Sequence, residues 1–441
     1  MTNKYKIHLI SLGCPKNRID GEIILKKLQD NGFDIVNEIE NADAVIINTC
    51  GFIEDAKTEA IETILDAAEY KNAGIISAII VTGCLAERYQ DEILKEMPEV
   101  DAVVGIGANS DIVKICQKAL CGVKTSIFPN KCYLPLDDER MAQSSSHWAY
   151  LKISDGCDNR CSYCAIPSIR GAYRERTIES ILSEARQLVE NGVNEIILVA
   201  QDTTKYGIKL YGEYRLSYLL KRLSEIDGLE WIRIYYCYPD KVTDELIETI
   251  ANEEKVCSYI DMPLQHCNAE ILKAMNRSGD YNSLKSLILK MKKRIPDLSL
   301  RTTFMVGFPG ETDEQFEELC RFVKEMKFDK MGCFAYSPEE DTPAVDFDCQ
   351  IDDDVKKRRA EVLMDVQYTV TENANKARVG KVYKTVIDGF ENGEYYGRCY
   401  LDSPEIDSSI IINTDNELTI GAFTDVRITD YNGYDLIGET V

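Results

Sequence analysis

Short runs of branched apolar residues alternate with longer amphipathic segments along most of this chain, and this alternation limits the possible folds strongly. In the first part, strand-like runs cover residues 6–12, 44–49, 75–82 and 100–106. Helical periodicity fills the intervals at residues 19–30, 54–70 and 91–97. Because each helix returns the chain to the starting end of the next strand, the strands lie parallel. We therefore expect an open parallel α/β sheet over residues 1–125.

The alternation resumes after a linker that we expect at residues 126–146, which ends in the polar run Gln143-Ser144-Ser145-Ser146. Further strands are predicted at residues 147–154, 195–202, 231–238, 258–265, 299–306 and 330–337. Six βα units in succession predict a partial TIM-type (β/α)6 barrel over residues 147–350. The reactive site of such a barrel lies at the C-terminal ends of its strands.

The last part of the chain has a different pattern. A charged connecting helix is expected over residues 351–377. Residues 378–441 are rich in β-branched and aromatic residues, with turns at Glu391-Asn392-Gly393 and Asn432-Gly433. Short alternating strands between such turns predict a small β-barrel.

The net charge of −24 and the isoelectric point near 4.7 bear on the choice of partner. Such a chain repels a phosphate backbone at long range, so a nucleic-acid substrate is disfavoured and a basic protein partner is favoured. The longest apolar runs are too short to span a bilayer, and the N-terminus lacks the pattern of an export signal. We expect a cytoplasmic protein with no membrane partner.

The sequence has 16 cysteines, of which three lie close together in Gly156-Cys157-Asp158-Asn159-Arg160-Cys161-Ser162-Tyr163-Cys164. The spacing C-x3-C-x2-C supplies three thiolates for an iron–sulfur cube and leaves its fourth iron open for chemistry. A structural zinc site is the alternative, but it usually needs four closed ligands in separated pairs.

Three more cysteines, Cys14, Cys50 and Cys84, each follow a predicted strand of the first sheet. Since the C-terminal ends of parallel strands share one edge, these thiols should converge there and hold a second cluster. Buried strand-end thiols without a ligand are the alternative. The remaining cysteines are predicted to be structural: Cys116, Cys121, Cys132, Cys237, Cys257, Cys267, Cys320, Cys333, Cys349 and Cys399.

Polar residues at the ends of the later strands are candidate ligand contacts. Gln201 and Asp202 end the second strand of the barrel, and Gln265 and His266 end the fourth. Arg233, on the third strand, could pair with a cofactor carboxylate or form a structural ion pair. After the fifth strand, the turn contains Gly307, Gly310 and Glu311, and it is either a cofactor contact or a plain tight turn.

The cysteine loop after the first barrel strand resembles that of the radical S-adenosylmethionine (SAM) enzymes. With the three N-terminal cysteines and a C-terminal β-barrel that resembles a TRAM domain, the chain is similar to the methylthiotransferases. Three segments resemble the branch that modifies a ribosomal protein, and they are Ile153 to Cys161, Tyr336 to Pro343 and Gly397 to Asp407. The tRNA-modifying relatives usually carry basic or neutral residues where this chain has Glu339 and the acidic trio Asp402, Glu405 and Asp407.

This resemblance implies a function. Cys157, Cys161 and Cys164 would hold a 4Fe-4S cluster that binds SAM, and Cys14, Cys50 and Cys84 a second 4Fe-4S cluster. One SAM would donate a methyl group and another would be cleaved to a 5′-deoxyadenosyl radical, so that a methylthio group is added to the β-carbon of an aspartate in small-subunit ribosomal protein twelve. A sulfur donor and a low-potential electron donor of the flavodoxin or ferredoxin type are also implied.

Two residue roles depend on the same resemblance. Tyr163 would either contact the adenine of SAM or pack under the loop. Asp402, Glu405 and Asp407 would bind a basic protein loop, with a solvated acidic turn as the alternative. The rival functions are a tRNA adenosine methylthiotransferase, an electron-transfer iron–sulfur protein and a nucleic-acid-binding module with structural zinc.

Overall fold

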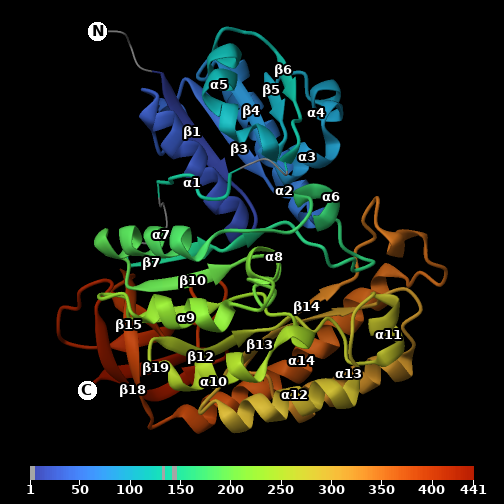
Figure 1. Ribbon diagram of the computed structural model, residues 1–441, viewed down its shortest axis with the longest axis vertical. Coiled ribbons are helices and arrows are strands. Elements are labelled where there is room, and N and C mark those ends of the chain that lie inside the picture. Colours follow the sequence, from blue (N-terminus) through green and yellow to red (C-terminus); the bar gives the residue numbers. More distant parts are fainter. Residues whose placement is uncertain (1–4, 132–134, 142–146) are drawn as a thin grey trace.

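Three structural units follow one another along the chain in the computed structural model, which describes residues 5–131, 135–141 and 147–441 (Figure 1). They are an open parallel sheet with helices on both faces, a second open parallel sheet curved as a partial barrel, and a closed barrel. The fold class expected from the sequence is therefore confirmed. The predicted linker residues 143–146 and Cys132 lie outside the described residues.

The first sheet has the strand order β2-β1-β3-β4-β5-β6, and every pairing in it is parallel. Its strands are β1 (Lys6–Ser11), β2 (Asp34–Ile35), β3 (Ala44–Thr49), β4 (Ala78–Gly83), β5 (Ala102–Val104) and β6 (Thr125–Ile127). Helices α1 (Pro15–Asp30) and α5 (Ile112–Leu120) pack on one face, and α2 (Glu54–Asn72), α3 (Cys84–Tyr89) and α4 (Asp91–Glu96) on the other. Successive residues of β3 point to opposite faces of the sheet, as in any strand. Ile46 packs in the core with α1 and α5, and Ile47 packs in the core with α2, α3 and α4.

The second sheet has the order β14-β13-β12-β11-β10-β7, so its first and last strands do not pair and the barrel stays open. Its strands are β7 (Trp148–Lys152), β10 (Glu195–Val199), β11 (Trp231–Ile234), β12 (Val256–Asp261), β13 (Ser299–Val306) and β14 (Lys330–Ala335), and a short hairpin joins β8 (Ser154–Asp155) to β9 (Arg174–Glu175). The helices are α6 (Ile166–Arg170), α7 (Ile178–Glu190), α8 (Ile208–Tyr211), α9 (Leu216–Ser224), α10 (Asp244–Asn252), α11 (Ala269–Ala274), α12 (Tyr281–Arg294) and α13 (Asp313–Met326). Most of them pack against the convex face, in the largest apolar core.

The long helix α14 (Asp353–Arg378) leads into the closed barrel of β15 (Val382–Glu391), β16 (Glu394–Cys399), β17 (Ile410–Asn413), β18 (Phe423–Asn432) and β19 (Asp435–Thr440). This barrel does not stand apart from the rest of the molecule. Val386 joins a core that also contains Trp148, Trp231 and Tyr259 from the inner face of the partial barrel, together with Ile19 from α1. One core therefore joins all three units.

The segment between the two sheets is more firmly attached than a linker is expected to be. Strand β6 extends the first sheet to Ile127, beyond the predicted boundary at residue 125. Arg140 is almost fully buried, and it pairs with Glu22 of α1 and with Glu184 of α7. Among residues 5–131, 135–141 and 147–441, no helix has the length and apolarity needed to cross a lipid bilayer.

Candidate active site

Cys14, Cys50 and Cys84 lie near one another at one edge of the first sheet. They follow β1, β3 and β4, which are adjacent strands. Gly13 has a left-handed φ of +83°, and a Cβ added to it would lie 2.6 Å from the Cβ of Cys50. Only glycine allows this approach. Cys14 and Cys84 also stand at helix starts, Cys14 as the N-cap of α1 and Cys84 as the first residue of α3.

The three thiols of this N-terminal triad differ in their electrostatic surroundings. Burial, helped by the neighbouring Cys14 and Cys50, raises the pKa of the Cys84 thiol to about 12, although the nearby Arg170 opposes the shift. Burial also raises the pKa of Cys14, but the charges of Lys16 and Arg170 and two backbone N–H groups outweigh it and lower that pKa overall. The helix N-terminus and two cations thus favour a thiolate at Cys14.

The second triad occupies the loop that follows the short strand β8. Gly156 opens this loop with φ +73°, and a Cβ there would lie 2.2 Å from the carbonyl oxygen of Ala172. The backbone N–H of Cys157 donates to Gly171 at 3.1 Å, and that of Cys164 donates to Cys161 at 3.1 Å. Arg277 and the hydroxyl of Tyr238 each lie 3.9 Å from the Sγ of Cys161.

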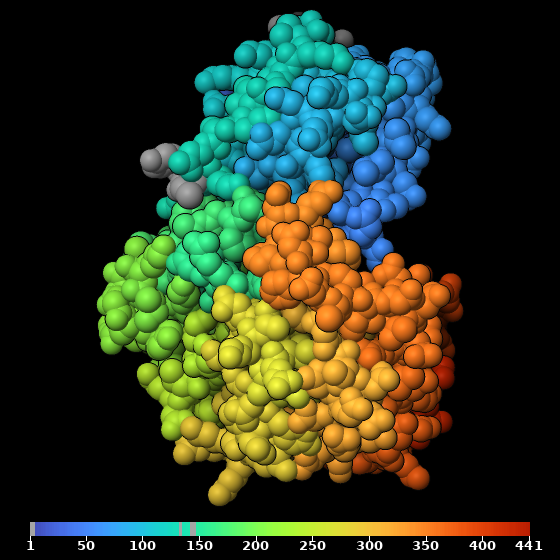
Figure 2. Space-filling view, turned by 90° about the vertical axis from the view of Figure 1, so that its right-hand side faces the viewer, coloured from blue at the N-terminus to red at the C-terminus, as the bar shows by residue number. Residues whose placement is uncertain are grey.

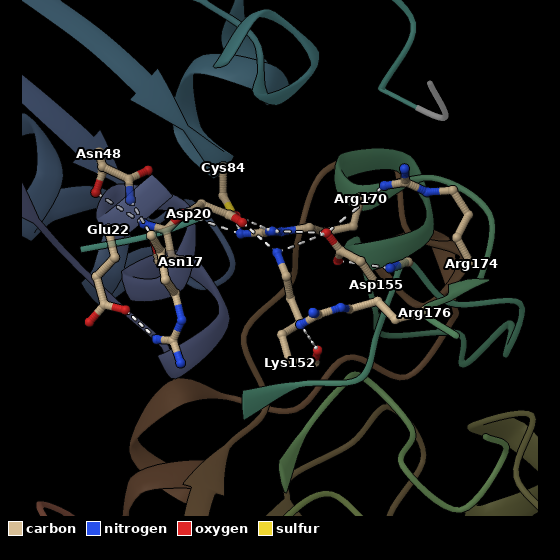
Figure 3. A network of polar contacts seen from close by, with 12 residues as sticks. Asn17, Asp20, Glu22, Asn48, Cys84, Lys152, Asp155, Arg170, Arg174 and Arg176 are labelled. Carbon is tan, nitrogen blue, oxygen red and sulfur yellow. Dashed lines mark hydrogen bonds and ion pairs between the residues drawn. The ribbon is translucent and has the colours of Figure 1, made fainter. Parts of the chain in front are cut away.

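A buried polar network centred on Arg170 lies next to both triads, and Figure 3 shows it with Cys84 of the first. Arg170 lies in α6, just after the second triad, and its guanidinium donates to Asp20 of α1, to Asp155 at 3.4 Å and to the Sγ of Cys84 at 3.6 Å. Asp155 also accepts the backbone N–H of Gly156 at 2.8 Å, at the start of the second loop. Arg170 is thus in contact with a thiol of one triad and with the support of the other.

The chemistry of these groups fits two iron–sulfur clusters with three protein ligands each. Each triad is buried or half-buried and made of thiols alone, and cations lie close to Cys14 and to Cys161. In the described part of the chain, no group of three or more His, Cys, Asp or Glu side chains is placed to hold a single metal ion.

A cavity of about 530 Å³ opens next to the N-terminal triad. Cys14 and Arg18 line it from the first unit, Tyr236 and Arg301 from the partial barrel, and Glu405 from the closed barrel. The guanidinium of Arg18 pairs with Glu405 at 2.7 Å across the opening. All three units therefore shape a path from the surface to Cys14.

The polar residues predicted at the strand ends do lie at the barrel mouth, but several are already engaged. Asp202 is buried and accepts from Lys241 at 2.6 Å and from Asn159 at 3.0 Å, so it orients the second triad's loop. The Nε2 of Gln201 donates to Asp155 at 3.1 Å, while its Oε1 is buried without a partner. Gln265, with φ +70°, uses its backbone to bridge β13. Gln201 and Gln265 stay predicted cofactor contacts.

The turn after β13 packs mainly against α14. Gly307 has φ +71°, and a Cβ there would lie 2.3 Å from Lys356 of α14. The Glu311 carboxylate accepts from the backbone N–H of Gly307 and pairs with Arg359 of α14 at 3.5 Å. Next to Gly310, by contrast, a Cβ would meet no atom within 4 Å. Of the three, Gly310 alone keeps open space for a cofactor.

Tyr163 is half-buried between Cys161 and Cys164. It packs against the apolar cluster that contains Phe308 and Tyr336, and its hydroxyl lies 3.5 Å from Arg277. His266 is fully buried and accepts the backbone N–H of Asn268 at 2.9 Å. The structure thus supports the packing alternative for Tyr163, whereas the Nε2 of His266 is buried without a hydrogen-bond partner.

The prediction that Arg233 contacts a cofactor carboxylate is corrected. Its side chain is fully buried, pairs with Glu195 at 2.9 Å and donates to the carbonyl of Tyr400 in the closed barrel at 2.7 Å. Both contacts fix the closed barrel against the partial barrel, so Arg233 forms the structural ion pair.

The acidic trio is corrected for two of its three members. Asp402 is 2% exposed and pairs with Lys330 of β14. Asp407 accepts from the hydroxyl of Tyr259 at 2.7 Å and pairs with Arg301 at 3.4 Å. These carboxylates hold the closed barrel in place and are not free to bind a substrate. Glu405 alone is half-exposed and lines the cavity.

Glu339 is likewise not a surface carboxylate. It is 2% exposed and pairs with Arg88 of α3 at 2.8 Å and with Lys57 of α2 at 3.3 Å. Figure 2 shows the segment around residue 340 reaching up against the N-terminal unit. Its role is to join two units.

Comparisons with known proteins agree with this architecture. A model of the radical SAM superfamily matches residues 151–323, the uncharacterized protein family UPF0004 matches residues 6–105, and a TRAM domain matches residues 379–441. A ribosomal protein uS12 methylthiotransferase RimO from Thermoanaerobacter sp. (strain X514) is 48% identical over 435 residues, which cover 98% of this chain and 99% of the relative. The RimO of Clostridioides difficile (strain 630) is 46% identical over 439 residues, 99% of each protein. This chain belongs to the RimO family.

The RimO family is a family of radical SAM methylthiotransferases, so the resemblance found in the sequence is confirmed and the chain is an enzyme. The radical SAM match implies one 4Fe-4S cluster and SAM. Among solved structures, the radical SAM methyltransferase TsrM from Kitasatospora setae has a TM-score of 0.58 at 12% identity, over 77% of each chain. At that identity the likeness shows the fold alone.

The sequence did not indicate the residues that connect the triads, namely Asp20, Lys152, Asp155 and Arg170. Lys152 pairs with Asp20 at 2.6 Å, although 132 positions separate them in the chain. Charged residues within apolar stretches, such as Lys152 at the end of β7, were the available signal. Their partners become visible only when the first sheet is docked on the barrel.

Proposed function

We propose that this protein adds a methylthio group to the β-carbon of an aspartate in ribosomal protein uS12, with SAM as both methyl donor and radical source. The main support is the presence of two three-thiol sites with Arg170 between them. The sites are Cys14, Cys50 and Cys84 on the first sheet, and Cys157, Cys161 and Cys164 on the barrel. The RimO relatives are named for uS12, which supports this substrate. A uS12 substrate would place the activity in the cytoplasm.

In this proposal the two triads have different tasks. The Cys157 triad would hold the cluster that binds SAM, and the N-terminal triad would hold a second 4Fe-4S cluster near the sulfur that is transferred. When bound, these groups would supply the radical and the methylthio sulfur. The chain itself binds and orients: Gly310 has open space beside it, the Oε1 of Gln201 is a buried acceptor without a partner, and Arg170 would fix one triad relative to the other.

The cavity supports a protein loop as the substrate. It opens between α1 and the closed barrel, beside the half-exposed Glu405, and reaches Cys14. The chain's charge of −24 favours a basic protein over tRNA. An electron donor of the flavodoxin or ferredoxin type and a separate sulfur donor complete the proposal, and these partners follow from the reaction class.

The decisive experiment is anaerobic reconstitution of the full chain with iron, sulfide, SAM and a low-potential reductant. The enzyme is offered uS12 or tRNA, and mass spectrometry records which gains a methylthio group. We expect a mass gain on the target aspartate of uS12 and none on tRNA. Modification of tRNA instead would overturn the substrate assignment.

Variants test the separate roles of the triads. Cys84→Ala should abolish methylthio transfer while 5′-deoxyadenosine is still formed, and Cys161→Ala should abolish both. Cys116→Ala is the matched control, because Cys116 is a fully buried thiol in an apolar core away from both triads. Full transfer by Cys84→Ala would contradict the second cluster.

A further inference from the structure

Lys16 is a buried cation whose ammonium is not paired with a carboxylate of the described chain. It follows Cys14 by two positions in α1 and is 7% exposed. Its Nζ donates to the carbonyl of Ala200 at 3.3 Å and lies 3.6 Å from the centroid of the Tyr236 ring. Within the described chain, no carboxylate is at ion-pairing distance from it. An ammonium has three donors, and a buried charge is costly unless an ion pairs with it.

The nearby carboxylates are already neutralised by other cations. Asp155 is held by Arg170 at 3.4 Å and by Lys152 at 3.7 Å. Asp261 accepts from Arg301 at 3.1 Å and from the backbone N–H of Tyr236 at 3.0 Å. Lys16 is therefore a cation at the mouth of the barrel that these carboxylates do not pair with, in a chain whose acidic residues greatly outnumber its basic ones.

The Cys14 thiol feels the charge of Lys16 without a direct hydrogen bond to it. The backbone N–H groups of Lys16 and Asn17 at the start of α1 also favour its thiolate form. In the described part of the chain, no hydrogen bond joins the Nζ of Lys16 to that sulfur. The ammonium extends instead past Cys14 toward Ala200 at the C-terminal end of β10, where the strand ends form the reaction site of a barrel.

The surroundings of Lys16 have the features of a binding site. The Tyr236 ring that contacts the ammonium also lines the cavity of about 530 Å³, together with Cys14. Tyr236 holds a left-handed φ of +59°, a strained conformation for a tyrosine that the Asp261 contact maintains. Beside Ala200, the Oε1 of Gln201 is a buried acceptor without a partner. The ammonium of Lys16, the unpartnered acceptor of Gln201 and the strained backbone of Tyr236 therefore all belong to this part of the barrel mouth.

We propose that Lys16 binds the side-chain carboxylate of the target aspartate, with the Tyr236 ring as the wall of that site. The proposal rests on the proposed function and deepens it, because it names the group that selects the target residue. A carboxylate bound there would sit beside the N-terminal triad, so that its β-carbon lies next to Cys14. The carboxylate of SAM is the other possible anion, and it is expected at the Cys157 triad.

The test compares two peptides that carry the target loop of uS12, one with the target aspartate and one with asparagine there. Their dissociation constants are measured with the reconstituted full-length enzyme, its Lys16→Met variant and its Lys26→Met variant. Lys26 is the control because it lies on the same helix and pairs with Asp30 at the surface. The dissociation constant for SAM is measured on the same three proteins.

We expect the wild type and Lys26→Met to prefer the aspartate peptide by roughly tenfold or more, the usual value of one charge-assisted hydrogen bond. Lys16→Met should bind both peptides equally, at the affinity of the wild type for the asparagine peptide, and should keep its affinity for SAM. Lys16→Gln, a second variant that keeps a donor without the charge, should also lose the preference.

Three results would overturn the inference. Equal affinity of the wild type for the two peptides would overturn the inference whatever the variants show, even if none of them folds. The inference would also be overturned if Lys16→Met still preferred the aspartate peptide. It would equally be overturned if Lys16→Met lost affinity for SAM alone. Methylthiolation of uS12 by the wild type is scored separately, so a failure here leaves the proposed function standing.

Discussion

Arg170 makes many of the contacts that fix the position of one triad relative to the other. One planar guanidinium reaches Asp20 on the first sheet's helix, Asp155 under the second triad and the sulfur of Cys84. Lysine could not replace it, because the three acceptors lie in different directions and only the planar guanidinium of arginine has donors that point toward all of them.

Replacement of Arg170 by methionine should therefore be strongly destabilising. The change leaves Asp20 and Asp155 buried with fewer cations, and breaking such pairs costs about 3–5 kcal/mol. A second change, Asp20→Asn, should restore part of that loss because it removes one of the uncompensated charges. Urea unfolding of the wild type, the single variant and the double variant measures both effects.

The control is Arg186→Met on the exposed side of α7, which should change the free energy of unfolding by no more than about 0.5 kcal/mol. Simple additivity of the two changes would contradict the network.

The limits of sequence-based prediction are clear at this scale. The six triad cysteines were found because their spacing or their position after strands carries the signal. Asp402 and Asp407 were misjudged because a turn rich in carboxylates is usually solvated, whereas here Lys330 and Tyr259 bind them. The partners come from another unit of the chain, so local pattern could not reveal the burial.

At the scale of elements, hydrophobic periodicity located the long strands and helices well. The predicted runs at residues 44–49 and 299–306 coincide with β3 and β13. Strands β2 and β6 were missed because two or three residues are too few to show alternation, and the predicted set also lacked α5. What periodicity could not show is how the closed barrel docks, which depends on ion pairs such as that of Arg398 with Glu195 at 2.8 Å.

Asp388 gives this docking a dependence on pH. The Asp388 carboxylate accepts from His147 at 2.8 Å and from Arg398 at 2.7 Å. Burial raises its pKa, but these two partners outweigh burial and lower the pKa below the usual value of about 3.9. A depressed pKa means that the stabilisation is complete above the unfolded value and is lost as pH falls through the folded one.

Asp388→Asn should accordingly lower the free energy of unfolding by about 2 kcal/mol at pH 7. The difference from the wild type should shrink as the pH is lowered below 4. Urea unfolding followed by tryptophan fluorescence is the right measurement, because both tryptophans, Trp148 and Trp231, lie in the core shared with the closed barrel. A difference that stays constant or grows on acidification would show that the charge of Asp388 does not matter.

At the scale of the whole molecule, the site exists only because separate units are locked together. Cys84 begins the short helix α3, and this helix is held by the barrel at both ends. Arg170 contacts Cys84 at its start, and Glu339 pairs with Arg88 near its end. Six residues of helix would have little stability alone, so the position of one cluster ligand depends on contacts made by another unit.

Glu339→Gln tests this dependence directly. The change leaves Arg88 and Lys57 buried with one carboxylate fewer, and we expect the free energy of local opening of α3 to fall by about 3 kcal/mol. Amide hydrogen exchange over Cys84–Tyr89 should then speed up by roughly a hundredfold, while exchange in the core strand β13 stays unchanged. Glu340→Gln is the matched control, because the adjacent Glu340 is more exposed and its carboxylate accepts only a hydroxyl hydrogen bond from Tyr89 at 2.7 Å. If Glu339→Gln and Glu340→Gln give the same exchange rates in α3, then the N-terminal triad is positioned without help from the barrel.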